Sequence, residues 1–131
     1  MKILDFRQLN VYKGALKCAI NIFEISKQFP REERYSLTDQ IRRSSRSVCA
    51  NIAEAWRKRR YPASFISKLT DADAEAAEST VWLEIASRCD YVNATLYKEF
   101  SDHYDHICAQ LVRMSVAPHQ WCNLDIKRKG Q

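Results

Sequence analysis

The chain has 131 residues, of which 46% are hydrophobic and 28% are charged, a balance typical of one globular domain with its own core. Two glycines and three prolines are too few for the tight turns of a β-sandwich or barrel, no apolar run is long enough to span a membrane, and the N-terminus lacks the apolar stretch of a secretory signal. The formal net charge of +5 is unevenly distributed, which indicates a basic patch.

Apolar residues at helical spacing predict a first helix over residues 11–29. Pro30 ends it, because proline disfavours helical geometry in the residue before it. A second apolar stripe predicts a helix over residues 37–60. Ser36 and Asp39 resemble a capping box at its start, with Asp in the place of Glu.

A third helix is predicted over residues 62–91, with Pro62 in the first turn, where its missing N–H costs nothing. Asn93 is a good N-cap for a fourth helix that ends before Pro118. The core stripes of these two helices are Phe65, Leu69, Ala72, Ala76, Thr80 and Leu83, then Leu96, Phe100, Ile107, Leu111 and Met114. Four long helices with short links predict an all-α, antiparallel up-and-down four-helix bundle over residues 1–117.

Residues 118–131 are predicted to form a separate basic tail that is mobile unless a partner holds it. The tail ends with the basic run Lys127, Arg128 and Lys129. The five cysteines are odd in number and contain no CxxC pair. They indicate reduced, mostly core-facing thiols in a cytoplasmic protein and argue against a zinc site.

A second apolar line runs along the third predicted helix, nearly opposite its core stripe. A surface helix of a monomer should be polar there, so this line predicts a homo-oligomer. The alternative is a helix buried at the centre of a lopsided bundle. The predicted interface comprises Ala74, Val81, Trp82 and Ile85. The neighbouring acids, which are Asp71, Glu75 and Glu78, are placed to face the basic second helix of another copy.

The second predicted helix carries a dense set of cations, several of them opposite its core stripe. This set comprises Arg42, Arg43, Arg46, Arg57, Lys58, Arg59 and Arg60. Arginine offers a planar fork of donors that suits phosphate, so we expect contacts with RNA or DNA, assisted by the basic run of the tail. Cations near a helix C-terminus also favour the helix dipole, but this does not explain the three mid-helix arginines. Trp56 and Tyr61 are candidates for stacking on unpaired bases, although Trp56 also fits packing at the core edge.

Few residues indicate catalysis. Glu99, His103 and His106 share one face of the fourth predicted helix and could hold a divalent metal, but the HxxH spacing is common by chance. Polar residues at the margin of a bundle are the simpler interpretation. The chain has no glycine-rich phosphate loop and no nucleophile motif. We therefore expect no enzymatic activity, no cofactor and no metal.

The segment over residues 35–55 reads YSLTDQIRRSSRSVCANIAEA. It resembles the pattern of the four-helix-bundle family named after proteins encoded in intervening sequences of bacterial 23S rRNA genes. The matching positions are Leu37, Gln40, Ile41, Arg42, Arg43, Ser47, Asn51, Ile52, Ala53 and Glu54. The resemblance covers about residues 2 to 115 and includes the opening DFRQL. Within it we expect Gln40, Asn51 and Glu54 to be structural.

The resemblance implies a barrel-like homopentamer with a basic surface and no known enzymatic activity. Related proteins are accessory subunits of diversity-generating retroelements, in which a pentamer binds a reverse transcriptase and RNA, and this role is the alternative function. Ala55 stands where the family often has glycine, and the tail from Trp121 onward has no counterpart in the pattern.

Overall fold

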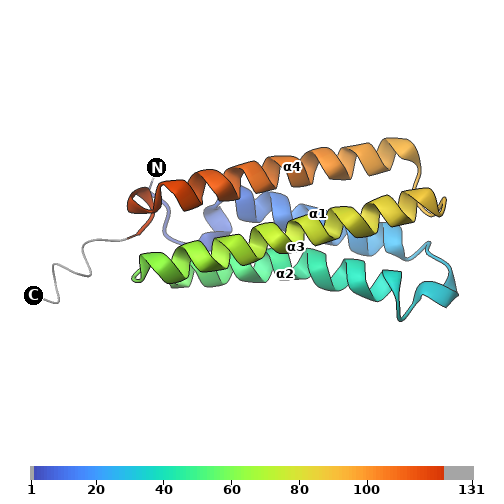
Figure 1. The fold of residues 1–131 in the computed structure, drawn as a ribbon, viewed down its shortest axis with the longest axis horizontal. Coiled ribbons are helices and arrows are strands. Elements are labelled where there is room, and N and C mark those ends of the chain that lie inside the picture. The colour runs from blue at the N-terminus through green and yellow to red at the C-terminus, as the bar shows by residue number, and fades with distance from the viewer. Residues whose placement is uncertain (1, 123–131) are drawn as a thin grey trace, which may run out of the picture.

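The computed structural model describes residues 2–122, and all regular secondary structure within that range is helical. Its long elements are α1 (Asn10–Ser26), α2 (Leu37–Arg57), α3 (Pro62–Arg88) and α4 (Ala94–Val116), which lie side by side along the long axis of the molecule (Figure 1). Three short 3-10 helices accompany them: η1 (Phe6–Gln8), η2 (Arg31–Glu33) and η3 (Pro118–Gln120). No helix of residues 2–122 is long and apolar enough to cross a membrane.

The helix ends follow local hydrogen bonding. The predicted N-cap at Asn93 is confirmed, because its Oδ1 accepts a hydrogen bond from the Leu96 amide at 2.8 Å. The predicted capping box of α2 is wrong: the Ser36 side chain makes no cap bond, and the Glu33 carboxylate accepts from the Leu37 amide at 3.4 Å instead. The helix α2 ends at Arg57, three residues before the predicted end, since the chain then turns toward α3.

The core is one continuous cluster of buried apolar side chains from all four helices. Each helix packs against two others in the ring order α1, α2, α3, α4. Two features of the predicted stripes need correction. On α3 the buried position is Ser79, whereas the neighbouring Thr80 is half-buried and its hydroxyl bonds to the Ala77 carbonyl at 2.6 Å. On α4 the fully buried Tyr104 was not assigned to the stripe.

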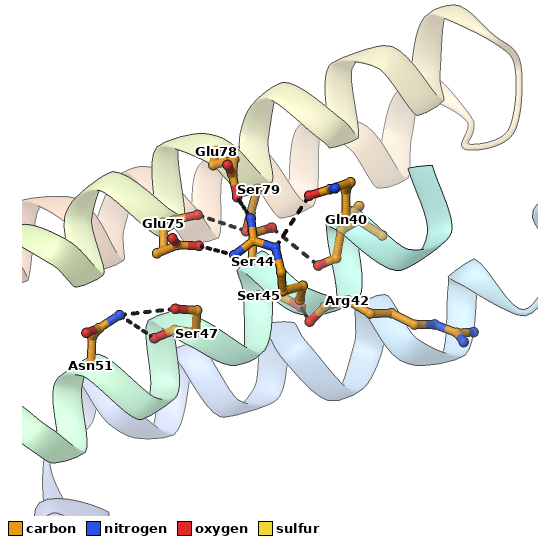
Figure 2. Close-up of polar contacts among 11 residues, drawn as sticks. Gln40, Arg42, Ser44, Ser45, Ser47, Asn51, Glu75, Glu78 and Ser79 are labelled. Atoms are coloured by element: carbon orange, nitrogen blue, oxygen red, sulfur yellow. Dashed lines mark hydrogen bonds and ion pairs between the residues drawn. The ribbon is translucent and has the colours of Figure 1, made fainter. Parts of the chain in front are cut away.

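A pair of buried serines joins α2 and α3. The hydroxyls of Ser44 and Ser79 are 2.8 Å apart, and both residues are fully buried (Figure 2). Ser79 also donates to the Glu75 carbonyl at 3.0 Å. Small side chains at this level allow the two helices to approach, and the paired hydroxyls satisfy each other. Burial raises the pKa of Tyr104, which keeps its phenol neutral in the core.

The turn between α3 and α4 contacts the segment that connects α1 to α2. This turn contains Asp90, the one non-glycine residue of the described range with a positive φ, at 61°. The Tyr91 phenol donates to the Glu33 carboxylate at 3.0 Å, and its ring lies 5.6 Å from that of Phe29. The hydrogen bond to Glu33 raises the pKa of Tyr91 to about 12. We call this group, which comprises Phe29, Glu33 and Tyr91, the aromatic clamp.

The opposite end of the bundle holds both η1 and η3. Residues 118–122 pack onto the bundle, and Cys122 is buried in the core cluster, so the ordered packing extends beyond the predicted boundary at residue 117. Trp121 and Gln8 help to line a pocket of about 300 Å³ at this end. The basic run Lys127, Arg128 and Lys129 lies outside the described residues.

Candidate nucleic-acid interface

The basic residues of α2 project in three different directions. Arg43 turns toward α3, where its guanidinium pairs with Glu78 and lies 3.5 Å from the Glu75 carboxylate. Its Nε also donates to the Gln40 side chain at 3.4 Å. Figure 2 shows the two glutamates of α3 reaching down to this position. The acids that were expected to face another copy therefore meet a cation of their own chain.

Burial raises the pKa of Glu75 above its ordinary value, and the neighbouring Glu78 adds to the rise. Arg43 acts in the opposite direction, because a nearby positive charge favours the ionised carboxylate. The charge of Arg43 is thus balanced within the protein, and this arginine is a poor candidate for a phosphate contact.

Arg42 turns to the opposite flank of α2, toward α1 (Figure 2). Its Nε donates to the Ser26 hydroxyl at 2.7 Å, and its guanidinium lies 4.7 Å from the centre of the Phe23 ring. Arg46 lies over the same ring at 5.8 Å but remains exposed. These cation–π contacts orient both guanidinium groups along the junction of α1 and α2.

The C-terminal end of α2 and the turn that follows it carry the densest positive charge. Arg57, Lys58 and Arg60 are exposed there, and the Tyr61 ring beside them is 60% exposed. We call these four residues the turn cluster. The C-terminus of α2 favours cations at this point because its last carbonyls carry partial negative charge.

Arg59 differs from its neighbours in the turn cluster. Its guanidinium lies 3.4 Å from the centre of the buried Trp56 ring, and its Nε donates to the Trp56 carbonyl at 2.7 Å. Burial lowers the pKa of Arg59, which nevertheless stays charged at neutral pH because an arginine titrates so far above it. Trp56 is buried and covered by Arg59, so it cannot stack on a base. Tyr61 is the aromatic ring of this region that solvent can reach.

The residues expected to be structural all bond within the chain. Asn51 donates to the carbonyl and hydroxyl of Ser47 at 3.0 and 3.1 Å (Figure 2). Glu54 pairs with Lys68 of α3 at 2.8 Å. The hydrogen bond to Glu54 raises the pKa of Lys68. Lys68 also lies 3.8 Å from Asp71, so the third acid expected at an interface has a partner in its own chain.

The second apolar line of α3 lies on the surface. Val81 and Ile85 are 50% and 40% exposed, Ala74 is exposed, and Trp82 is half-buried against the core. A central helix buried on all sides is therefore not what the structure contains.

A second apolar surface was not identified from the sequence. A groove of about 350 Å³ lies between α1 and α2. Its lining comprises Leu16, Ala19, Ile20, Phe23, Arg46 and Cys49, and we call it the α1–α2 groove. The spacing of Leu16, Ile20 and Phe23 by four and three residues was the available signal, because it draws a second line on the flank of the first helix.

The residues considered for a metal do not form a ligand set. Glu99, His103 and His106 are all exposed on α4. Within residues 2–122, no group of three or more His, Cys, Asp or Glu side chains is arranged to hold a metal ion.

The described residues define an all-α four-helix bundle. The family model of the 23S rRNA-intervening sequence protein matches residues 7–113. The chain therefore belongs to the 23S rRNA-intervening sequence protein family, as the QIRR and NIAE residues of α2 had indicated.

A solved structure supports this assignment. The chain is similar to a protein of unknown function from the S23 ribosomal protein family of Bacteroides thetaiotaomicron VPI-5482. The two are 31% identical with a TM-score of 0.73, over 80% of this chain and 97% of the other. No curated protein matches the chain.

Proposed function

We propose that the chain is an antiparallel up-and-down subunit of a non-enzymatic homo-oligomer, a barrel-like pentamer, that associates with the phosphates of RNA or DNA in the cytoplasm. The turn cluster carries this proposal. Arg57, Lys58 and Arg60 are exposed and take part in no ion pair with another residue of the described range 2–122. Family membership and the free state of all five cysteines support the family-type assembly and the reducing compartment.

The basic residues have two different roles, which follow from the contacts that each one makes. Arg46 and the three cations of the turn cluster contact phosphate, because their charges face solvent. Arg42, Arg43 and Arg59 shape the surface, since each is already bonded to its own chain. Tyr61 offers a flat ring to an unpaired base. Each subunit offers four phosphate-binding cations. For a short single-stranded RNA that contacts one subunit, the logarithm of the affinity therefore falls with the logarithm of the salt concentration with a slope of about −3.

The binding of a labelled single-stranded RNA, followed by fluorescence anisotropy from low to high salt, tests this proposal. The variant replaces Arg57, Lys58 and Arg60 with Gln. Its matched control replaces Arg88, Lys98 and Arg113, which are exposed cations on α3 and α4, with Gln. Both variants lose the same charge, so a nonspecific effect of net charge lowers both equally.

The turn-cluster variant loses at least about tenfold in affinity at low salt, and its salt slope becomes shallower by about 2, because three phosphate contacts are removed. The control stays within about twofold of the original protein. Equal losses in the two variants, or no loss in the turn-cluster variant, would refute a specific phosphate-binding face.

A further inference from the structure

Two apolar surfaces of the bundle have no cover from the residues described. One is the α1–α2 groove, at whose rim Leu16 and Ile20 are 42% and 55% exposed. The other is the outer face of α3, where Ala74, Ala77, Val81 and Ile85 are all exposed. We call this second surface the α3 ridge. Aliphatic side chains left in water on two separate faces indicate protein contacts on both of them.

The two surfaces are complementary in shape. The groove is concave because it lies between two helices, whereas the α3 ridge is the convex side of one helix. Leu16 and Ile20 are four residues apart, and so are Val81 and Ile85, so each pair forms one row along its helix. Rows of this spacing interdigitate when two helices pack. Ala74 and Ala77 have short side chains, so the backbone of α3 can come close to a neighbouring helix.

The two surfaces are also opposite in charge. The helices α1 and α2 together contain six bases and three acids, whereas α3 contains five acids and two bases. Lys13 and Lys17 each precede an exposed groove residue by three positions, and neither takes part in an ion pair among residues 2–122. Glu78 and Glu84 flank Val81 at the same distance of three positions. They pair with Arg43 and Arg88 of their own chain, but their side chains stay 35% and 55% exposed and can accept a second cation. A ridge placed in the groove of another copy therefore brings acids to lysines.

We propose that the α1–α2 groove of one copy receives the α3 ridge of a second copy, so that each copy offers two different surfaces to its two neighbours. A twofold contact of ridge with ridge would place acids against acids, and groove with groove would place lysines against lysines. The outer face of α4 is charged or polar at mid-length, from Lys98 to His106, and its exposed aliphatic pair, Val112 and Val116, is confined to the C-terminal turns of that helix. A contact between unlike surfaces repeats from copy to copy until the ring closes.

This inference rests on the oligomer of the proposed function and assigns its contact surfaces. Two variants test it: Ile20→Glu places an acid in the groove, and Val81→Arg places a large cation on the ridge. Ala109→Glu, on an exposed position of α4, is the matched control. Mass is measured by light scattering, and circular dichroism checks that each variant retains its helices. Each of the two variants falls to the 15.3 kDa of a single chain, while the control keeps the mass of the original protein.

Mixing the two variants provides the decisive result. The Ile20→Glu chain keeps an intact ridge and the Val81→Arg chain keeps an intact groove, so an equimolar mixture regains a complex of at least two chains in a 1:1 ratio. The inference is overturned if the mixture stays at the mass of one chain, if only one variant loses the oligomer, or if the original protein is itself monomeric. The RNA measurement is separate, because the turn-cluster variant keeps its oligomeric mass even when it no longer binds RNA.

Discussion

Replacing Arg43 with Gln separates a structural role from a role in binding. Arg43 forms ion pairs with Glu75 and Glu78, in which the arginine side chain is 49% exposed and the glutamates are 25% and 35% exposed. Exposed pairs contribute about 0.2 to 1 kcal/mol each, so losing both costs about 1 kcal/mol of unfolding free energy at pH 7. For a chain of this length, that loss lowers the melting temperature by about 4 °C.

The loss should depend on pH, and its sign follows from Glu75. The folded protein raises the pKa of this carboxyl above its unfolded value, so the folded state holds the proton more tightly and stability falls as pH rises through that interval. Removing Arg43 raises the pKa of Glu75 further, because the arginine was lowering it. The difference between variant and original protein is therefore largest at neutral pH. It shrinks below about pH 4, where the carboxyl is protonated in both states.

Urea unfolding at pH 7 and at pH 3.5 measures this difference, and the anisotropy assay measures RNA affinity in parallel. Arg43→Gln retains RNA binding within about twofold, because its charge is already paired. In a chain whose Glu75 and Glu78 are replaced with Gln, the loss of unfolding free energy caused by Arg43→Gln no longer depends strongly on pH. Unchanged stability together with a tenfold loss of RNA affinity would show that the reasoning about Arg43 is wrong.

Two further predictions follow from helix ends and cysteines. Asn93→Ala costs about 1 kcal/mol in unfolding free energy, because the Asn93 side chain caps α4. The control Ser36→Ala removes no cap bond and stays within about 0.5 kcal/mol of the original protein. Urea unfolding measures both changes, and equal losses would contradict the assignment of the caps. Burial raises the pKa of Cys18 and of the half-buried Cys49 to about 11, so at pH 8 an aromatic disulfide reagent modifies the exposed Cys89 at least about 100-fold faster. Mass spectrometry of the labelled peptides checks this, and equally rapid labelling of Cys18 and Cys49 would contradict it.

Most of the fold could be predicted from the sequence because the apolar stripes have a clear helical period. The family could be predicted as well, from the motif in α2. The choice between Ser79 and Thr80 could not, since both lie near the same edge of the stripe. Ser79 is buried because its hydroxyl meets Ser44 and bonds back to its own helix, a pairing that needs the position of α2.

The candidate site was harder to predict than the fold. Arg42 and Arg43 are adjacent in sequence and about 100° apart on a helix, so one faces α1 and the other faces α3. Which neighbour lies on which side of α2 depends on how the bundle is wound, and periodicity carries no information about that. The start of α2 posed a similar problem, because its cap comes from Glu33, which lies in η2, a short helix that the apolar periodicity does not mark.

The aromatic clamp couples two turns that are far apart in the sequence. Glu33 accepts from the first amide of α2 and from the phenol of Tyr91, which is 58 positions away. Opening the turn between α3 and α4 removes one partner of Glu33 and frees this carboxylate to leave the first amide of α2. We therefore expect the start of α2 and the turn between α3 and α4 to open together, which hydrogen exchange of the Leu37 amide would report.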